Sequence, residues 1–169
     1  LTAYGLYFGS QGLLKISKDG VLTEEADYSI LPIDAVDYGA WIHDQGYGVV
    51  GAAGKSGLLD DWATTPADMK AIEAWDKVVD LGVGGIDPFN YLEINEKEHD
   101  KAYWGAWGFR RITNRKKRKI SKFMKKENGV TENAYEIFVE KYFEINESGH
   151  HEKREGYWEV DADGKPIPG

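Results

Sequence analysis

Residues 37–47 have the sequence DYGAWIHDQGY, and the expected fold and function both depend on this stretch. If it is helical, His43 and Tyr47 lie four residues apart and share a face, with Asp44 on the adjacent flank. Burying a titratable base, a carboxylate and a phenol together costs free energy that a purely structural helix avoids. The stretch is therefore a candidate reactive site. The alternative is a solvated His-Asp pair on a surface helix.

Two other stretches flank this candidate helix. Residues 4–12 have glycine at positions 5, 9 and 12 with aromatic residues between them, which predicts either a cation-binding loop or a turn with aromatic packing. Glycine permits positive φ, which lets backbone carbonyls converge on a hard cation such as calcium. Downstream, Thr65 and Pro66 predict the start of a second helix, with Asp68 in its first turn. Asp68 either compensates the helix dipole or, if the two helices are antiparallel, reaches His43.

The order of these pieces resembles the secreted phospholipase A2 superfamily. The pattern P-x-D-x-x-D-x-x-x-x-x-H-D-x-x-Y runs from Pro32 to Tyr47, between the glycine loop and the second helix. The resemblance covers residues 1 to about 80. It implies a mainly α fold, in which a glycine-rich calcium loop and a small β-hairpin precede two antiparallel catalytic helices. A basic, helical C-terminal extension would follow.

The resemblance also implies catalytic roles for individual residues. His43 would take a proton from water as the general base, and Asp68 would fix its tautomer and stabilise the imidazolium. Tyr47 would hydrogen-bond to Asp68. For Asp37, a structural hydrogen bond is expected rather than a part in catalysis. The implied reaction is hydrolysis of the sn-2 ester of a glycerophospholipid.

A calcium ion is the cofactor that the resemblance implies. The Asp44 carboxylate would bind it together with the backbone carbonyls of Tyr7, Gly9 and Gln11. Gln11 stands where the family usually has glycine. Calcium would polarise the ester carbonyl and hold the tetrahedral intermediate.

The chain contains no cysteine, whereas animal secreted enzymes of this class carry many disulfides. Several positions where the family has cysteine hold small residues, among them Gly39, Ala40, Gly46 and Ala67. Small residues suit two helices that approach closely without a covalent bridge. A cysteine-free chain of this kind is expected of a bacterial relative.

Charge is distributed unevenly along the chain. The segment 110–126 holds ten of the 21 Lys and Arg residues and no acid, which leaves 11 basic and 29 acidic residues elsewhere. An aromatic patch precedes it, and we expect the two to dock on an anionic phospholipid membrane, because cations favour anionic headgroups and Trp favours the interfacial region. The candidate membrane-binding residues are Trp104, Trp107, Phe109, Arg110 and Arg111. The alternatives are a solvated basic helix or a contact for an acidic partner.

Other function classes remain open at this stage. The basic segment is also compatible with a nucleic-acid-binding, metal-dependent nuclease, although the strongly acidic remainder would repel nucleic acid. A non-catalytic domain that binds a membrane or a partner is the third possibility. No apolar run is long enough for a membrane-spanning helix, and no signal peptide is recognised.

The expected organisation is one compact domain with two parts. Residues 1–88 would form the phospholipase-like core, and residues 89–169 the aromatic and basic extension packed on it. Such a chain fits the toxin domain of a larger secreted polypeptide, for example an Rhs-type effector of type VI secretion. It would act at the target-cell membrane, and a cognate immunity protein would block its cleft.

Overall fold

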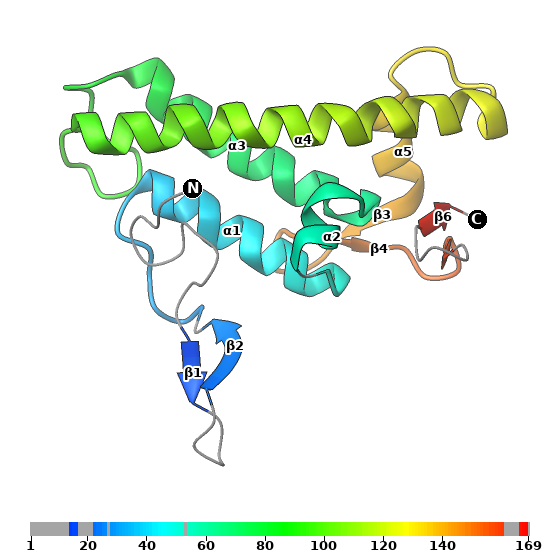
Figure 1. The fold of residues 1–169 in the computed structure, drawn as a ribbon, viewed down its shortest axis with the longest axis horizontal. Coiled ribbons are helices and arrows are strands. Elements are labelled where there is room, and N and C mark those ends of the chain that lie inside the picture. Colours follow the sequence, from blue (N-terminus) through cyan, green and yellow to red (C-terminus); the bar gives the residue numbers. More distant parts are fainter. Residues whose placement is uncertain (1–13, 17–21, 27, 53, 161–165, 169) are drawn as a thin grey trace. The chain divides into compact units, whose positions relative to one another are not determined.

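The computed structural model describes residues 14–16, 22–26, 28–52, 54–160 and 166–168, and this part of the chain is mainly α-helical, as predicted (Figure 1). The helices are α1 (Ala35–Val50), α2 (Gly54–Leu59), α3 (Thr65–Leu81), α4 (Glu96–Asn128) and α5 (Ala134–Tyr142), with a 3-10 helix η1 (Trp62–Thr64). The strands form antiparallel pairs: β1 (Leu14–Ile16) with β2 (Leu22–Ala26), β3 (Phe143–Ile145) with β4 (His151–Lys153), and β5 (Trp158–Val160) with β6 (Pro166–Pro168). The first pair is the hairpin expected before the first long helix.

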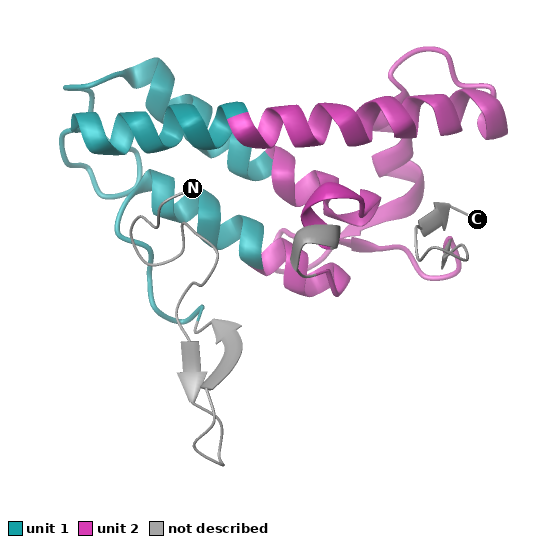
Figure 2. Cartoon of the chain, viewed as in Figure 1, with its two compact units in different colours: residues 1–44, 70–107 teal, residues 45–69, 108–169 magenta. Residues whose placement is uncertain are grey.

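The chain divides into two compact units (Figure 2). Unit 1 consists of residues 1–44 and 70–107, and unit 2 of residues 45–69 and 108–169. Each unit contains residues from both sides of position 88. The units therefore do not correspond to the predicted parts 1–88 and 89–169, and that division stays a prediction. The two units are described separately below.

Local sequence signals set the helix ends. The first long helix begins at Ala35, because the Asp34 carboxylate accepts the Asp37 backbone N–H at 2.8 Å and acts as the cap. At its C-terminus, helix α4 is terminated by Gly129, whose φ of 67° is the left-handed conformation that glycine adopts without strain. Its N–H donates to the Lys125 carbonyl at 3.1 Å.

In unit 1, the first turns of α1 pack against the middle of α3. The Trp75 side chain is 1% exposed, and its indole N–H donates to the Val36 carbonyl at 2.9 Å. A Cβ placed on Gly39 would lie only 2.5 Å from the same indole nitrogen. Glycine at position 39 is therefore required by the close approach of Trp75, in agreement with the small residue expected there.

The segment between α3 and α4 is hydrogen-bonded to the start of α1 through one carboxylate. Asp87, which is fully buried, accepts the backbone N–H of Ala35 at 3.0 Å. Its second oxygen accepts the N–H groups of Phe89 and Asn90 at 2.7 and 3.0 Å. These bonds satisfy backbone donors that burial would otherwise leave unpaired.

In unit 2, the C-terminal half of α4 and helix α5 share one hydrophobic core. The apolar side chains recur at helical spacing on α4, and rings from the C-terminal segment close over them. The buried members are Val50, Ala63, Ile120, Met124, Phe138, Tyr142 and Phe143. The Trp158 indole, which packs against this cluster, donates to the Tyr142 carbonyl at 2.7 Å.

The aromatic patch and the basic segment belong to one helix of 33 residues, α4. The sequence reading predicted a helical extension here but not a single element of this length. None of the described helices combines the length and apolar character needed to cross a bilayer.

Candidate functional site

Asp68 lies at the centre of a buried polar cluster in unit 2. The Tyr47 hydroxyl donates to Asp68 Oδ1 at 2.6 Å, which confirms the predicted hydrogen bond between these residues. The Lys116 ammonium donates to Asp68 Oδ2 at 2.8 Å and to Thr64 Oγ1 at 2.7 Å. Asp68 and Lys116 are each 1% exposed. A buried carboxylate is thus neutralised by a buried lysine and oriented by a phenol.

The sequence analysis missed Lys116, because it assigned the whole basic segment to the protein surface, as a membrane-docking segment or a solvated helix. The signal that identifies it is its spacing. Lys116 precedes Ile120 and Met124 by four and eight residues, which places it on the apolar stripe of α4. A lysine on an apolar stripe needs a buried anion, and Asp68 is that anion.

The two tyrosines near Asp68 are held neutral. Burial raises the pKa of the Tyr47 hydroxyl, and the Asp68 charge and the hydrogen bond to it raise that pKa further. Burial likewise raises the pKa of Tyr135, whereas a hydrogen bond with Thr65 opposes the shift. A neutral Tyr47 keeps the proton that it donates to Asp68.

His43 and Asp44 lie in unit 1, on the same turn of α1. His43 is 8% exposed, and its Nδ1 lies 3.6 Å from Asp44 Oδ1. Burial raises the pKa of the Asp44 carboxyl, although His43 opposes this effect. Asp37, fully buried, accepts the Ile33 N–H at 3.0 Å, which confirms its predicted structural hydrogen bond.

A second His-Asp neighbour pair helps to evaluate the first. His99 and Asp100 on α4 show the same 3.6 Å separation, but their side chains are 27% and 70% exposed. The His43 and Asp44 side chains are 10% and 29% exposed. Sequence adjacency accounts for the distance in both pairs, and burial is what distinguishes His43 and Asp44.

Several predicted contacts cannot be compared with the structure. The calcium-loop residues Tyr7, Gly9 and Gln11 lie outside the described residues. His43 and Asp68 belong to different units, so their pairing stays a prediction. Within the described ranges, no three His, Cys, Asp or Glu side chains gather as a metal-binding group. A set made of one carboxylate and backbone carbonyls would not form such a group.

Unit 1 contains a further carboxyl pair, Glu98 and Asp87. Glu98 is 4% exposed. Burial, a hydrogen bond with Asp87 and the Asp34 charge together raise the pKa of its carboxyl to about 9. At neutral pH Glu98 is therefore protonated and shares that proton with Asp87.

The candidate membrane residues are largely accessible. In unit 1, the Trp104 and Trp107 side chains are 55% and 47% exposed. Their rings meet edge to face, with centroids 5.8 Å apart. In unit 2, Arg110 and Arg111 are exposed and Phe109 is half-buried. The accessibility that membrane contact requires is present, and binding itself stays a prediction.

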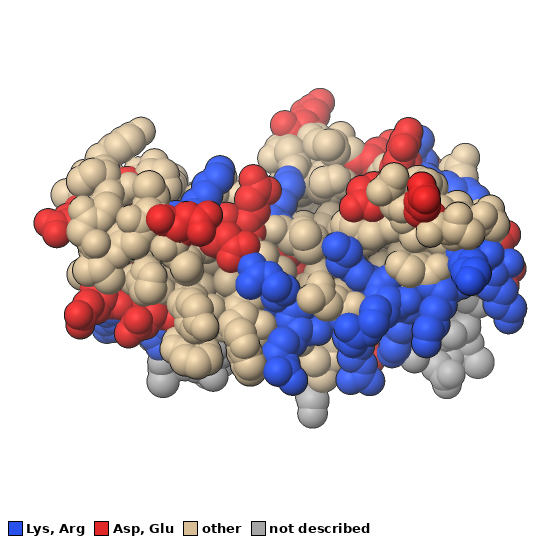
Figure 3. Space-filling model, turned by 90° about the horizontal axis from the view of Figure 1, so that it is seen from above, with Lys and Arg blue, Asp and Glu red and all other residues tan. Residues whose placement is uncertain are grey.

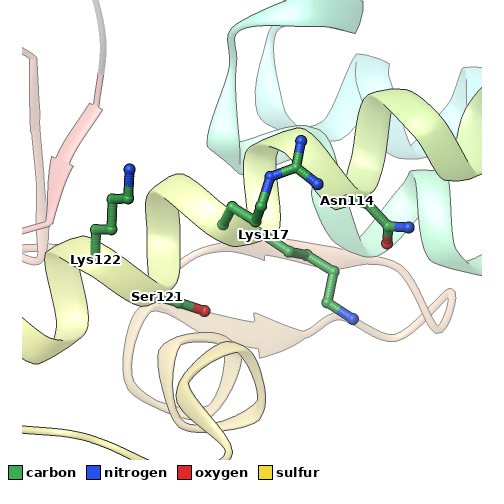
Figure 4. A pocket seen from close by; sticks show the side chains of 5 residues that line it. Asn114, Lys117, Ser121 and Lys122 are labelled. Atoms are coloured by element: carbon green, nitrogen blue, oxygen red, sulfur yellow. The ribbon is translucent and has the colours of Figure 1, made fainter.

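Beyond Arg111, the outer face of α4 in unit 2 is strongly basic (Figure 3). A hollow of about 360 Å³ lies on this face (Figure 4), lined by Asn114, Lys117, Arg118, Ser121 and Lys122. A neighbouring hollow of about 320 Å³ shares Ser121 and Lys122 and extends to Lys125 and the segment before α5. The sequence analysis had not singled out either hollow.

Comparisons of the chain with known protein families, with curated proteins and with solved structures found no match.

Proposed function

We propose that the chain hydrolyses the sn-2 ester of glycerophospholipids in a calcium-dependent reaction. The observation that supports this most is the hydrogen bond between Tyr47 and Asp68, two residues 21 positions apart. The phospholipase resemblance specifies this pair of residues, and no other pattern in the sequence does. The burial of His43 gives further support, because a buried imidazole beside a carboxylate suits a general base.

The proposed chemistry assigns proton transfer to His43. Its imidazole takes a proton from water as the water oxygen attacks the ester carbonyl, and it returns that proton to the alkoxide of the departing lysophospholipid. Asp68 accepts a hydrogen bond from His43 and stabilises the imidazolium. Tyr47 and Lys116 each occupy one Asp68 oxygen, and each oxygen retains a lone pair for a further hydrogen bond.

The residues that would hold calcium are Asp44 and the carbonyls of Tyr7, Gly9 and Gln11. Asp44 fits this role, because burial disfavours its charged form and a bound cation would offset that cost. The chemistry that calcium supplies when bound is polarisation of the ester carbonyl and stabilisation of the oxyanion.

Antiparallel packing of α1 and α3 as catalytic helices is part of the proposal. It accounts for the contact of Trp75 with Val36 in unit 1 and for that of Tyr47 with Asp68 in unit 2. Val36 at the start of α1 meets Trp75 past the midpoint of α3, whereas Tyr47 near the end of α1 meets Asp68 in the first turn of α3. The glycines of α1 at the close approaches, Gly39 and Gly46, are compatible with this arrangement.

The biological setting proposed is a bacterial toxin domain delivered within a larger secreted polypeptide. The exposed indoles of Trp104 and Trp107, together with Arg110 and Arg111, would dock it on an anionic membrane. A cognate immunity protein would protect the producing cell.

The decisive experiment is incubation with mixed phosphatidylglycerol and phosphatidylethanolamine vesicles, with calcium or with chelator, and analysis of the products by mass spectrometry. His43→Ala should abolish calcium-dependent release of fatty acid and lysophospholipid, since loss of a general base costs about 10²- to 10⁴-fold. Asp44→Ala should abolish it as well, because it removes the proposed calcium ligand. The matched controls are His99→Ala and Asp100→Ala, which remove the exposed His-Asp pair of the same geometry and should retain activity. Absence of lipid products, with DNA cleavage under the same metal, would contradict the proposal.

A further inference from the structure

The outer face of α4 in unit 2 carries an ordered row of cations. Arg115, Arg118, Lys122 and Lys125 are all exposed and follow one another at spacings of three or four residues. At about 100° per residue these positions fall on one stripe of the helix, which extends about 15 Å along its axis. The buried residues Lys116, Ile120 and Met124 occupy the other side.

None of the recorded ion pairs of the described residues neutralises this positive charge. Within the described chain, no carboxylate pairs with the side chains of this row, and α4 has no acidic residue between Asp100 and Glu127. Adjacent cations of the row are separated by about 5–6 Å along the helix axis, which is less than the Debye length of about 8 Å at physiological salt, so they repel one another. An anionic ligand would relieve this repulsion.

The side chains that line the hollow beside the row include hydrogen-bond donors suited to phosphate. It combines the ammonium groups of Lys117 and Lys122, the Arg118 guanidinium, and the amide and hydroxyl of Asn114 and Ser121. Figure 4 shows Lys117 and Lys122 leaving α4 in different directions. The volume of the hollow, about 360 Å³, lies in the range of small-ligand sites. Three of its five lining residues are cationic, so the ligand expected is anionic.

We propose that this face of α4 binds the phosphate groups of anionic phospholipid headgroups and so selects anionic bilayers. The proposal rests on the proposed function for its choice of lipid as the ligand. A straight row of cations meets a planar bilayer along its whole length, whereas the phosphates of a nucleic-acid duplex spiral away from a straight line. In unit 1, Tyr103 and Trp107 both pack at steep angles on Trp104, which suits the headgroup region better than base stacking.

The test measures binding of the whole chain to vesicles in chelator, so that calcium-dependent hydrolysis is excluded. Arg118→Gln/Lys122→Gln should weaken binding to phosphatidylglycerol vesicles about 25-fold, since each cation near an anionic surface contributes about a factor of five. The matched control is Lys141→Gln/Lys153→Gln, which removes the same charge from α5 and β4 of unit 2. It should weaken binding less than about threefold. Phosphatidylcholine vesicles should bind neither variant nor wild type.

Equal losses in the two double variants would overturn the proposal, because net charge alone would then explain binding. So would wild-type binding to a single-stranded oligonucleotide that exceeds its binding to the vesicles at the same salt concentration. Hydrolysis of a short-chain, monomeric phospholipid is measured in parallel with calcium. If that hydrolysis is absent while vesicle binding follows the expected pattern, the proposed enzymatic function fails and the headgroup site stands.

Discussion

Replacing Lys116 by methionine should destabilise the protein severely. The substitution preserves most of the side-chain volume but removes a buried ammonium 2.8 Å from Asp68 Oδ2 and 2.7 Å from Thr64 Oγ1. Asp68, which is 1% exposed, then loses its cationic partner and retains the hydrogen bond from the Tyr47 hydroxyl. Leaving one partner of a buried ion pair uncompensated typically costs about 3–5 kcal/mol.

The double variant separates the ion pair from its surroundings. Asp68→Leu alone should cost a similar amount, because it strands the ammonium. In Lys116→Met/Asp68→Leu neither member of the ion pair remains, and the main loss is the partner of the Tyr47 hydroxyl, about 1–3 kcal/mol. The two single losses should therefore exceed the double loss by at least about 3 kcal/mol.

Urea unfolding gives the free energies for this cycle, and thermal unfolding gives a second readout. For a chain of this length, 3–5 kcal/mol corresponds to a fall in Tm of about 6–20 °C. Lys126→Met, at an exposed position of the same helix, is the control and should change stability by no more than about 0.5 kcal/mol. Additive single losses, or a loss below about 1 kcal/mol for Lys116→Met, would refute the buried ion pair.

Three further predictions follow from other contacts. The raised pKa of Glu98, about 9 in the folded chain against an ordinary 4.5, means that the folded state holds a proton that the unfolded state loses. Its contribution to stability is complete below about pH 4.5 and declines up to about pH 9, so Glu98→Gln should flatten the pH dependence of Tm in that window, and an unchanged slope would argue against the assignment. Gly39→Ala should lower the free energy of unfolding in urea by about 1–3 kcal/mol, since its Cβ would clash with a buried indole. Gly48→Ala, which has open space around it, should instead stabilise α1 by up to about 1 kcal/mol. Equal effects of the two substitutions would contradict the packing of Gly39 against Trp75. Tyr47→Phe should lower stability by about 1–3 kcal/mol through loss of the hydrogen bond to a charged group, and it should reduce phospholipid hydrolysis more than it reduces vesicle binding; a normal rate of hydrolysis would remove the proposed role of this contact.

The sequence predicted those parts of the fold that depend on local pattern. The helical period around His43 and the Thr-Pro entry near Thr65 predicted α1 and α3. The contact of Tyr47 with Asp68 was predicted as well, but from a resemblance and not from periodicity. The start of α1 is set by capping from Asp34, which the helical period alone does not locate.

Features that depend on tertiary packing were not predicted. The basic composition of the segment around Lys116 concealed one lysine on the apolar side of α4, and only its partner Asp68 explains its burial. The proton shared by Asp87 and Glu98 likewise depends on two carboxyls that are distant in sequence. Composition describes a surface on average, whereas burial is decided one side chain at a time.

The division of the chain into two units has a consequence for inheritance and for dissection of the protein. The chain passes between the units at residues 44–45, 69–70 and 107–108, and these positions lie inside α1, α3 and α4 rather than in loops. No single cut yields a fragment that contains one complete unit and nothing else. A recombination event within any of these helices would exchange parts of both units at once. Truncation is therefore a poor way to assign functions to the units, and point substitutions are the appropriate tool.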